Sequence, residues 1–182
     1  MIVWTKQHED VVKELERTGR HFTRRKYIGK DLGECAPLVL EAYDWLVEHS
    51  PKAAEKPPDV EFPVWVTFTE GTTMLPSEKM VIFEMDVDPS IITLVNIEKW
   101  GTILNFSYIP ADLQDALDHQ KKMDGYGLSD AKAYMSRFYP EIKEEIVKSW
   151  DRLFDDSVII SSENSYGILW EMRKEWVTKI IR

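Results

Sequence analysis

One acidic residue, Glu171, interrupts an apolar run near the end of the sequence, where it stands between Trp170 and Met172. A carboxylate among apolar neighbours is a candidate acid–base group that can act on a substrate hydroxyl or on a ribose. The same run predicts a strand, and side chains alternate between the two faces of a strand. If Trp170 and Met172 point inward, Glu171 points to solvent. The pattern therefore leaves open a catalytic and an exposed carboxylate.

Three polar residues, Thr5, Lys6 and Gln7, stand at the end of the first predicted strand. Side chains at a strand end can enter a cleft beside the edge of the sheet, so Thr5 and Gln7 are candidate ligand-binding residues. The alternative is a strand end whose polar groups are simply hydrated.

Tyr43 and Asp44 form a polar pair on a predicted helix that is otherwise apolar. Both are candidate site residues, and Asp44 can cap a backbone group or pair with a basic side chain. Because buried polar groups need hydrogen-bond partners, the pair can equally serve the structure alone.

Basic residues cluster near the start of a chain that is otherwise acidic. Between Lys13 and Lys30 the cluster comprises Arg17, Arg20, His21, Arg24, Arg25 and Lys26, against only Glu14 and Glu16. An anionic ligand can bind to such a group of guanidinium and ammonium side chains. The arginines can also pair with the acidic remainder of the chain, so a ligand site and a solvated loop both stay open.

Several classes of site are excluded or disfavoured by the motifs that the sequence lacks. No Gly-rich phosphate loop follows a predicted strand, which excludes a P-loop and a dinucleotide-binding fingerprint. The four histidines lie far apart without paired ligand spacing, and Cys35 is the only thiol, so no structural zinc site is expected, while a site of mixed carboxylate and His ligands stays open. An acidic neighbour, Glu34, disfavours a reactive thiolate at Cys35, which we expect to be a small buried residue.

Apolar periodicity and capping residues, such as Asn96 before the helix predicted from residue 97, place the elements that must position these side chains. The predicted helices cover residues 10–18, 36–49, 97–104, 112–123, 129–138 and 141–154. The predicted strands cover residues 1–5, 64–68, 80–87, 91–95, 158–160, 165–172 and 177–181. Residues 20–33 are expected to form a loop, and the Pro-rich residues 50–63 a connector.

Strands at both ends of the sequence enclose the helical segments, and strands and helices do not alternate regularly. We therefore expect an α+β fold and a single globular domain over residues 1–182. Its small mixed or antiparallel sheet is formed by the N- and C-terminal strands, with several helices around it.

Composition restricts the surroundings and the partners. The 182 residues are 43% hydrophobic and include seven each of Trp, Tyr and Phe, which favours a packed domain over disorder. A single cysteine, with no apolar run typical of a signal peptide or a membrane span, indicates the reducing cytoplasm and no membrane association. The net charge of −9 argues against sequence-independent nucleic-acid binding.

Recurring aromatic–acidic segments resemble a known bacterial family. The segments Val3-Trp4-Thr5-Lys6-Gln7, Ala42-Tyr43-Asp44-Trp45-Leu46-Val47, Pro63-Val64-Trp65, Ser149-Trp150-Asp151-Arg152-Leu153-Phe154-Asp155 and Leu169-Trp170-Glu171-Met172 resemble, in this order, those of the domain of unknown function 3841. The resemblance spans nearly the whole chain. It implies one globular domain and carries no established activity.

A second, more distant resemblance is to ADP-ribosyltransferase-like domains. These domains begin with a short strand that bears a polar nucleotide-contacting residue and end with a strand that bears the catalytic Glu. The matching positions are Thr5 or Gln7 for ligand contact, and Tyr43 and Glu171 for catalysis. The family pattern has a Gln shortly before its final Trp, where residues 165–167 of this sequence are Ser, Tyr and Gly.

This second resemblance implies NAD as a cofactor. Glu171 would hydrogen-bond the nicotinamide ribose and stabilise an oxocarbenium-like transition state, while Arg20, Arg24 or Arg25 would hold the pyrophosphate. The function expected first is therefore a nucleotide- or NAD-binding ADP-ribosyltransferase-like domain. Fold analogy does not establish activity, so the question of an enzyme stays open.

The alternative is a non-enzymatic binding protein. An acidic, aromatic-rich surface can dock into the basic groove of a protein partner, as inhibitors encoded by phages or mobile elements do with RNA-guided nucleases and other enzymes that handle nucleic acids.

Overall fold

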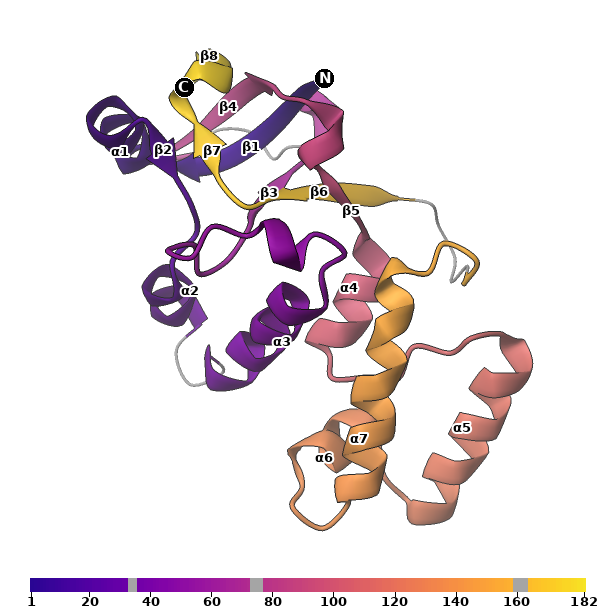
Figure 1. The fold of residues 1–182 in the computed structure, drawn as a ribbon. Coiled ribbons are helices and arrows are strands. Elements are labelled where there is room, and N and C mark those ends of the chain that lie inside the picture. The colour runs from indigo at the N-terminus through magenta and orange to yellow at the C-terminus, as the bar shows by residue number, and fades with distance from the viewer. Residues whose placement is uncertain (33–35, 73–76, 159–163) are drawn as a thin grey trace. The chain divides into compact units, whose positions relative to one another are not determined.

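The computed structural model describes residues 1–32, 36–72, 77–158 and 164–182 (Figure 1). Cys35 and most of the predicted strand 158–160 lie outside these ranges. The fold is α+β, as the sequence predicted, with small antiparallel sheets and helices around them. Among the described residues, no helix is both long and apolar enough to cross a membrane.

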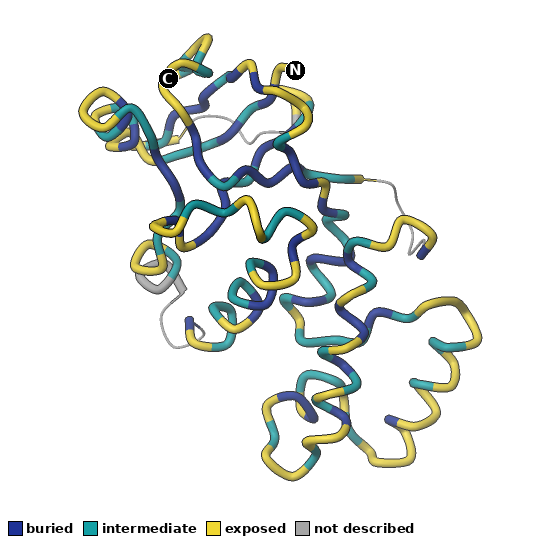
Figure 2. Tube along the Cα trace, in the orientation of Figure 1, coloured by how far each residue is buried: buried dark blue, intermediate teal, exposed yellow. Residues whose placement is uncertain are grey.

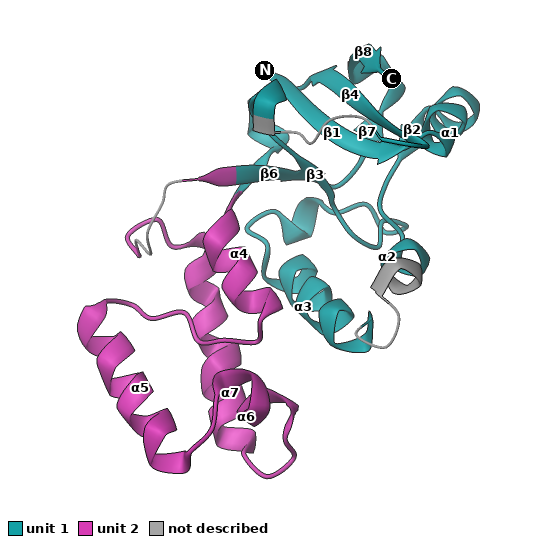
Figure 3. Ribbon diagram, turned by 180° about the vertical axis from the view of Figure 1, so that it is seen from behind, with its two compact units in different colours: residues 1–94, 166–182 teal, residues 95–165 magenta. Residues whose placement is uncertain are grey.

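The chain divides into two compact units (Figure 3). The first unit contains residues 1–94 and 166–182, and the second contains residues 95–165. The chain leaves the first unit within β5 (Thr93–Asn96) and returns to it within β6 (Ser165–Leu169). A single domain over residues 1–182 stays a prediction.

Both ends of the chain belong to one three-stranded sheet in the first unit (Figure 1). Its central strand is β4 (Met80–Asp86), with β1 (Ile2–His8) on one side and β8 (Val177–Ile181) on the other, each antiparallel to it. The ammonium group of Met1 lies 2.8 Å from a carboxylate oxygen of Asp86. These contacts confirm a sheet built from the N- and C-terminal strands.

A second sheet has the strand order β3-β6-β5, with β3 (Val64–Val66) antiparallel to β6. Gly167 pairs with Val66 in this sheet. A Cβ atom at Gly167 would lie 2.8 Å from methyl groups of both Ile92 and Val66, so this position has no room for a side chain.

One apolar cluster joins the strands of the first unit to the helix α1 (Asp10–Thr18). Val11 and Leu15, four residues apart on α1, share one helix face and are buried in it. The other fully buried members come from alternate strand positions and the adjoining loops: Val3, Val64, Val66, Val81, Phe83, Met85, Val87, Ile92, Leu169 and Met172. Figure 2 shows this buried interior in dark blue. The cluster fixes the end of β1 against α1, which is where the candidate site forms.

Residues 20–33 were predicted to form a loop, and this prediction is wrong. They contain the short strand β2 (Arg20–His21) and the helix α2 (Arg25–Leu32). Gly19, at φ +75°, ends α1 in the left-handed conformation that glycine tolerates and turns the chain into β2. β2 pairs with β7 (Met172–Arg173), a contact between segments far apart in the sequence.

The predicted helix over residues 36–49 is confirmed as α3 (Ala36–His49), and a 3₁₀ helix, Ala53–Glu55, lies within the Pro-rich connector.

The second unit is helical: α4 (Ile97–Leu104), α5 (Leu113–Tyr126), α6 (Asp130–Met135) and α7 (Pro140–Ser149), which continues as the 3₁₀ helix Trp150–Phe154. Asn96 caps α4 as predicted, because its side chain accepts hydrogen bonds from two backbone amides at the helix start. The predicted ends of the later helices are corrected. Gly125 lies inside α5, which Gly127 ends, and α6 stops before residue 138.

Polar contacts hold α5 in the second unit. Met123 is its one fully buried residue, and Figure 2 shows most of the helix exposed. Ion pairs connect α5 to its neighbours, Asp115 with Arg152 and Lys122 with Glu145, and the His119 ring lies 2.8 Å from a carboxylate oxygen of Asp130 and 3.5 Å from one of Glu145. Tyr108 adds a ring stacked on His119 at 4.0 Å between centroids.

The close packing around Gly167 predicts that Gly167→Ala lowers the free energy of unfolding by about 1–3 kcal/mol, because Val66 or Ile92 must shift to admit the new methyl group. Chemical denaturation measures the change. Gly101→Ala is the matched control. Gly101 lies within α4, where an added Cβ atom would have open space around it, and its replacement should stabilise the protein by about 0.5–1 kcal/mol. Equal effects at the two glycines would contradict this account of the sheet.

Candidate functional site

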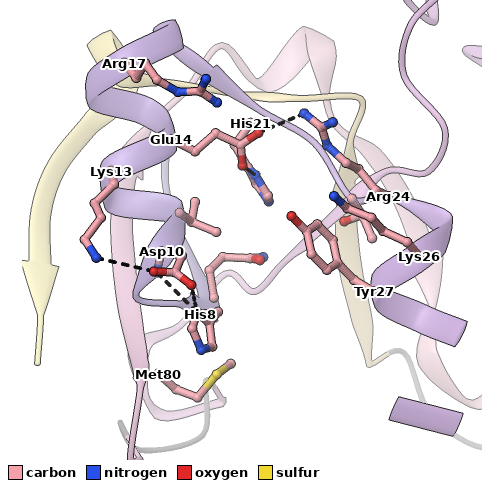
Figure 4. Close-up of a pocket in the computed structure, with 13 residues that line it drawn as sticks. His8, Asp10, Lys13, Glu14, Arg17, His21, Arg24, Lys26, Tyr27 and Met80 are labelled. Atoms are coloured by element: carbon pink, nitrogen blue, oxygen red, sulfur yellow. Dashed lines mark hydrogen bonds and ion pairs between the residues drawn. The ribbon is translucent and has the colours of Figure 1, made fainter. Parts of the chain in front are cut away.

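A pocket of about 740 Å³ lies in the first unit beside α1 (Figure 4). Its lining comes from the end of β1, one face of α1, and residues 21–27, which run from β2 into the first turn of α2; Met80 closes one side. We call it the α1 pocket. Its position follows from the Gly19 turn, because the turn carries the basic segment back alongside the helix that precedes it.

A carboxylate and an imidazole form the buried end of the α1 pocket. Nδ1 of His21 lies 2.6 Å from one oxygen of Glu14, and the Arg24 guanidinium lies 3.0 Å from the other. Only 4% of the His21 side chain and 15% of the Glu14 side chain are exposed. An ionised carboxylate only accepts hydrogen bonds, so Nδ1 carries the hydrogen and donates it to Glu14. When the ring is neutral, this leaves Nε2 as its acceptor nitrogen.

The surroundings of His21 favour its neutral form. Burial lowers the pKa of His21 below its ordinary value, the hydrogen bond and charge of Glu14 oppose this lowering, and the charge of Arg24 adds to it. Within the described chain, Nε2 has no hydrogen-bond partner. Figure 4 shows the His21 ring facing the space that Tyr27 approaches from the opposite wall. The site therefore holds an uncharged imidazole with a lone pair available to a ligand.

Four cationic side chains line the same pocket, against the carboxylates of Asp10 and Glu14: Lys13, Arg17, Arg24 and Lys26. Arg17 is exposed and has no ion-pair partner among the residues that the structure describes. Nε of Arg24 is buried without a hydrogen-bond partner in the same set of residues. Lys26 lies over the ring of Tyr27, with its Nζ 5.0 Å from the ring centroid. The α1 pocket is therefore electropositive and retains unused donors.

Thr5 and Gln7 reach the α1 pocket in different ways. Gln7 lines it, and its Nε2 donates a 2.9 Å hydrogen bond to the hydroxyl of Thr5. Thr5 itself is 2% exposed, so it orients the Gln7 amide and is not a lining residue. The structure thus brings Gln7 and Arg24, two of the predicted ligand-binding residues, into one pocket.

Glu171 lies elsewhere in the first unit, in a pocket of about 340 Å³ that it shares with Arg20 and Arg173. It occupies the break between β6 and β7 instead of a strand interior, so strand alternation does not apply. One carboxylate oxygen lies 2.6 Å from Nη2 of Arg20, and the other accepts a 2.8 Å hydrogen bond from Nε of Arg173. The residue is 8% exposed, which contradicts the interpretation of Glu171 as a solvent-facing carboxylate.

Arg20 spans two carboxylates. It also forms a bidentate pair with Asp59, at 2.9 and 3.3 Å, in addition to its contact with Glu171. With both Glu171 oxygens and the ends of Arg20 engaged, this group has the geometry of a structural clamp. It ties β2 and the break after β6 to the Pro-rich connector.

Tyr43 and Arg25 line neither of these two pockets. Tyr43 packs edge-on against Phe62 at 5.4 Å between centroids, and burial raises the pKa of its hydroxyl, partly offset by a hydrogen bond with Trp65. Arg25 forms an ion pair with Asp44 and lies over the Phe62 ring at 5.0 Å. Both residues join α2 and α3 around Phe62.

The sequence interpretation assigned no role to Glu14 and His21, the residues that form the buried end of the α1 pocket. They were counted only by charge, Glu14 as an acid opposing the basic cluster and His21 as one of its members. The available signal was the glycine between them, because a helix that ends at Gly19 can return the next residues along its own side. Among the described residues, no group of three or more His, Cys, Asp or Glu side chains is arranged to hold a metal ion.

Comparison with known proteins gives one match. A family model described as a domain of unknown function (DUF3841) matches residues 2–178, so the chain belongs to this family. No curated protein and no solved structure matches the chain. The resemblance to ADP-ribosyltransferase-like domains therefore stays a prediction.

The clamp geometry predicts that Glu171→Gln lowers the free energy of unfolding by about 2 kcal/mol, because a nearly buried amide cannot satisfy two guanidinium groups. Thermal or chemical denaturation measures the loss. Glu175→Gln is the matched control, since Glu175 is exposed and lies 3.8 Å from the same Arg173. Its effect should stay within about 0.5 kcal/mol. An E171Q variant as stable as the wild type would argue against a structural role for Glu171.

Proposed function

We propose that this member of the DUF3841 family binds a nucleotide, with NAD among the candidates, in the α1 pocket. The observation that carries the proposal is the group of cations around this pocket in a chain of net charge −9. Protein surfaces that concentrate basic side chains against the sign of the whole chain favour a specific anionic ligand. A volume of about 740 Å³ is within the range of small-molecule and cofactor sites.

The lining residues supply the contacts that a nucleotide needs. Guanidinium groups hold phosphate oxygens through paired hydrogen bonds, which suits Arg17 and Arg24, while Lys26 adds a point charge. The Gln7 amide both donates and accepts, and the Tyr27 ring offers an apolar face with a hydroxyl at its end. Phosphate binding by the arginines and base or ribose contact by Gln7 and Tyr27 are therefore compatible with one ligand.

The proposal also includes an ADP-ribosyltransferase-like activity. This activity can be tested with NAD. The Glu171 carboxylate, which the resemblance assigns to catalysis, is engaged by Arg20 and Arg173. If Glu171 acts on NAD, one arginine must release it first. Incubation with NAD labelled in its adenylate part, followed by detection of labelled protein, tests the transfer. Label incorporation that disappears in an E171Q variant that a melting assay shows to be folded would support it, and no incorporation by the wild type would exclude it under those conditions.

The nucleotide proposal predicts that Arg17→Ala weakens binding of NAD or ATP about tenfold, because one charge-assisted contact to phosphate is lost. Isothermal titration calorimetry at low ionic strength measures the dissociation constant. Arg137→Ala removes the same charge from an exposed position in the second unit and should change it less than about twofold. Adenosine, which lacks phosphate, should bind more weakly than either nucleotide. Absence of nucleotide binding by the wild type would refute the proposal.

The alternative, an acidic protein that docks on a basic partner, is supported by a different observation. Large apolar side chains are exposed on the second unit, where acidic residues outnumber basic ones: Leu113, Leu117, Tyr126, Met135 and Phe138. Exposed apolar residues next to acidic ones are typical of protein-binding surfaces. Leu113→Ser combined with Leu117→Ser leaves the α1 pocket unchanged. Loss in this variant of a basic partner that the wild type captures at low salt would favour this alternative.

A further inference from the structure

The buried Glu14–His21 pair is more than phosphate binding requires. Cations alone hold a phosphate, yet this pocket places an imidazole that is 4% exposed beside a carboxylate, with Nε2 open to the ligand space. Although the ring is nearly buried, Nε2 is not one of the buried side-chain atoms that lack a partner, so it stays accessible and forms no hydrogen bond within the described chain. A feature of this kind points to chemistry on the ligand.

The arrangement is that of a general base held by a positioning carboxylate. Glu14 fixes the ring orientation and keeps the hydrogen on Nδ1, and it stabilises the imidazolium that forms when Nε2 takes a proton. Arg24, bonded to the other oxygen of Glu14, holds that carboxylate in place. A base needs an acidic hydrogen to remove, and a ribonucleotide offers one in the hydroxyl beside its phosphate.

We propose that the α1 pocket cleaves short ribonucleotide phosphodiesters by transesterification, with His21 as the general base. This inference rests on the proposed nucleotide binding and adds a reaction to it. The carrying observation is that a hydroxyl-activating base and four cationic side chains, among them the unpaired Arg17, line the same cavity in the described chain. The net charge of −9 disfavours binding along a polynucleotide. The substrate class is therefore a short diester whose phosphate enters the pocket.

The reaction balances without a co-reactant. His21 Nε2 takes the proton of the ribose 2′-hydroxyl, and the 2′-oxygen forms a bond to the neighbouring phosphorus. The bond from phosphorus to the 5′-oxygen of the next nucleoside breaks, and this oxygen takes a proton from water. The proton on His21 then returns to the solvent. The products are a 2′,3′-cyclic phosphate and a nucleoside with a free 5′-hydroxyl.

Arg17 and Arg24 have a defined role in this step. The charge on the non-bridging phosphate oxygens grows as the new bond forms, and guanidinium groups placed beforehand stabilise it. Arg17 has no ion-pair partner among the described residues, and Arg24 contributes its positive charge to the pocket lining while its Nη2 holds Glu14. The cations therefore act on the phosphate while the imidazole acts on the hydroxyl.

The pH dependence has a definite direction. The rate should rise as His21 loses its proton and level off above its pKa, which burial holds below the ordinary value. The charged and titratable groups around the ring are Glu14 and Arg17 on α1, His8 at the end of β1, and Arg24 and Tyr27 on the opposite wall. Because Glu14 raises the pKa of His21, Glu14→Gln should move the acidic limb of the profile to lower pH.

The experiment incubates the full chain with dinucleoside monophosphates such as UpA and ApA, and separates the products by chromatography. We expect a 2′,3′-cyclic phosphate from the ribose probes and no cleavage of their 2′-deoxy counterparts. His21→Ala should reduce the rate about 100-fold or more, and Glu14→Gln about tenfold with the shift in pH profile. Arg137→Ala should leave the rate unchanged.

Binding of NAD and ATP by the same samples separates the two claims. Nucleotide binding without cleavage of any ribose probe overturns the reaction and leaves the binding proposal intact, while absence of both overturns both. Cleavage of the deoxy probes, or full activity in H21A, also overturns the role of His21. If H21A fails to fold in a melting assay, the pH profile of E14Q decides, and a profile identical to that of the wild type would overturn the mechanism.

Discussion

The antiparallel pairing of β2 with β7 is the contact on which both pockets depend. It joins Arg20 and His21 to Met172 and Arg173, and the amide of Lys174 adds a 2.9 Å hydrogen bond to the carbonyl of Gly19. A two-residue strand cannot persist alone, because its few backbone hydrogen bonds do not offset the entropy of ordering it. Here the pairing is supported by the turn at Gly19 and by the ion pair between Arg20 and Glu171. The N-terminal helix, the basic segment and the C-terminal strands are therefore positioned by one another.

A carboxylate held by two basic side chains occurs on each side of this pairing, but only one of the two groups leaves an atom available to a ligand. Glu171 and Glu14 are both nearly buried carboxylates held by two basic side chains. At Glu171 both partners are guanidinium groups, which have no acceptor nitrogen to offer to a ligand, so the group stabilises the fold. At Glu14 one partner is the imidazole of His21, whose second nitrogen extends the network into the pocket. The type of basic partner, and not the carboxylate, determines which site stays available to a ligand.

The sequence predicts what depends on local patterns and misses what depends on distant contacts. The bounds of α3 and the Asn96 cap of α4 follow from periodicity and capping chemistry that neighbouring residues supply. β2 and α2 were missed because β2 exists only through β7, and because α2 is mostly polar and contains a glycine. In the site, the choice of Gln7 and Arg24 agrees with the pocket lining, since both belonged to recognisable polar clusters. The burial of Glu171 could not be predicted, because a break in the strand between Leu169 and Met172 leaves no periodic signal.

The charge of the chain and the charge of the α1 pocket have opposite signs, and this contrast restricts the ligands that reach it. Within about 8 Å, the Debye length at physiological ionic strength, a small anion experiences mainly the pocket cations. A long polyanion also contacts the acidic surface around them, and each additional phosphate there is repelled. If the α1 pocket binds nucleotides as proposed, this contrast would favour small phosphorylated ligands over polynucleotides. Arg17 is central to this selection, because the other pocket cations share their charge with Glu14, Asp10 or the Tyr27 ring, and its own guanidinium has no such partner among the described residues.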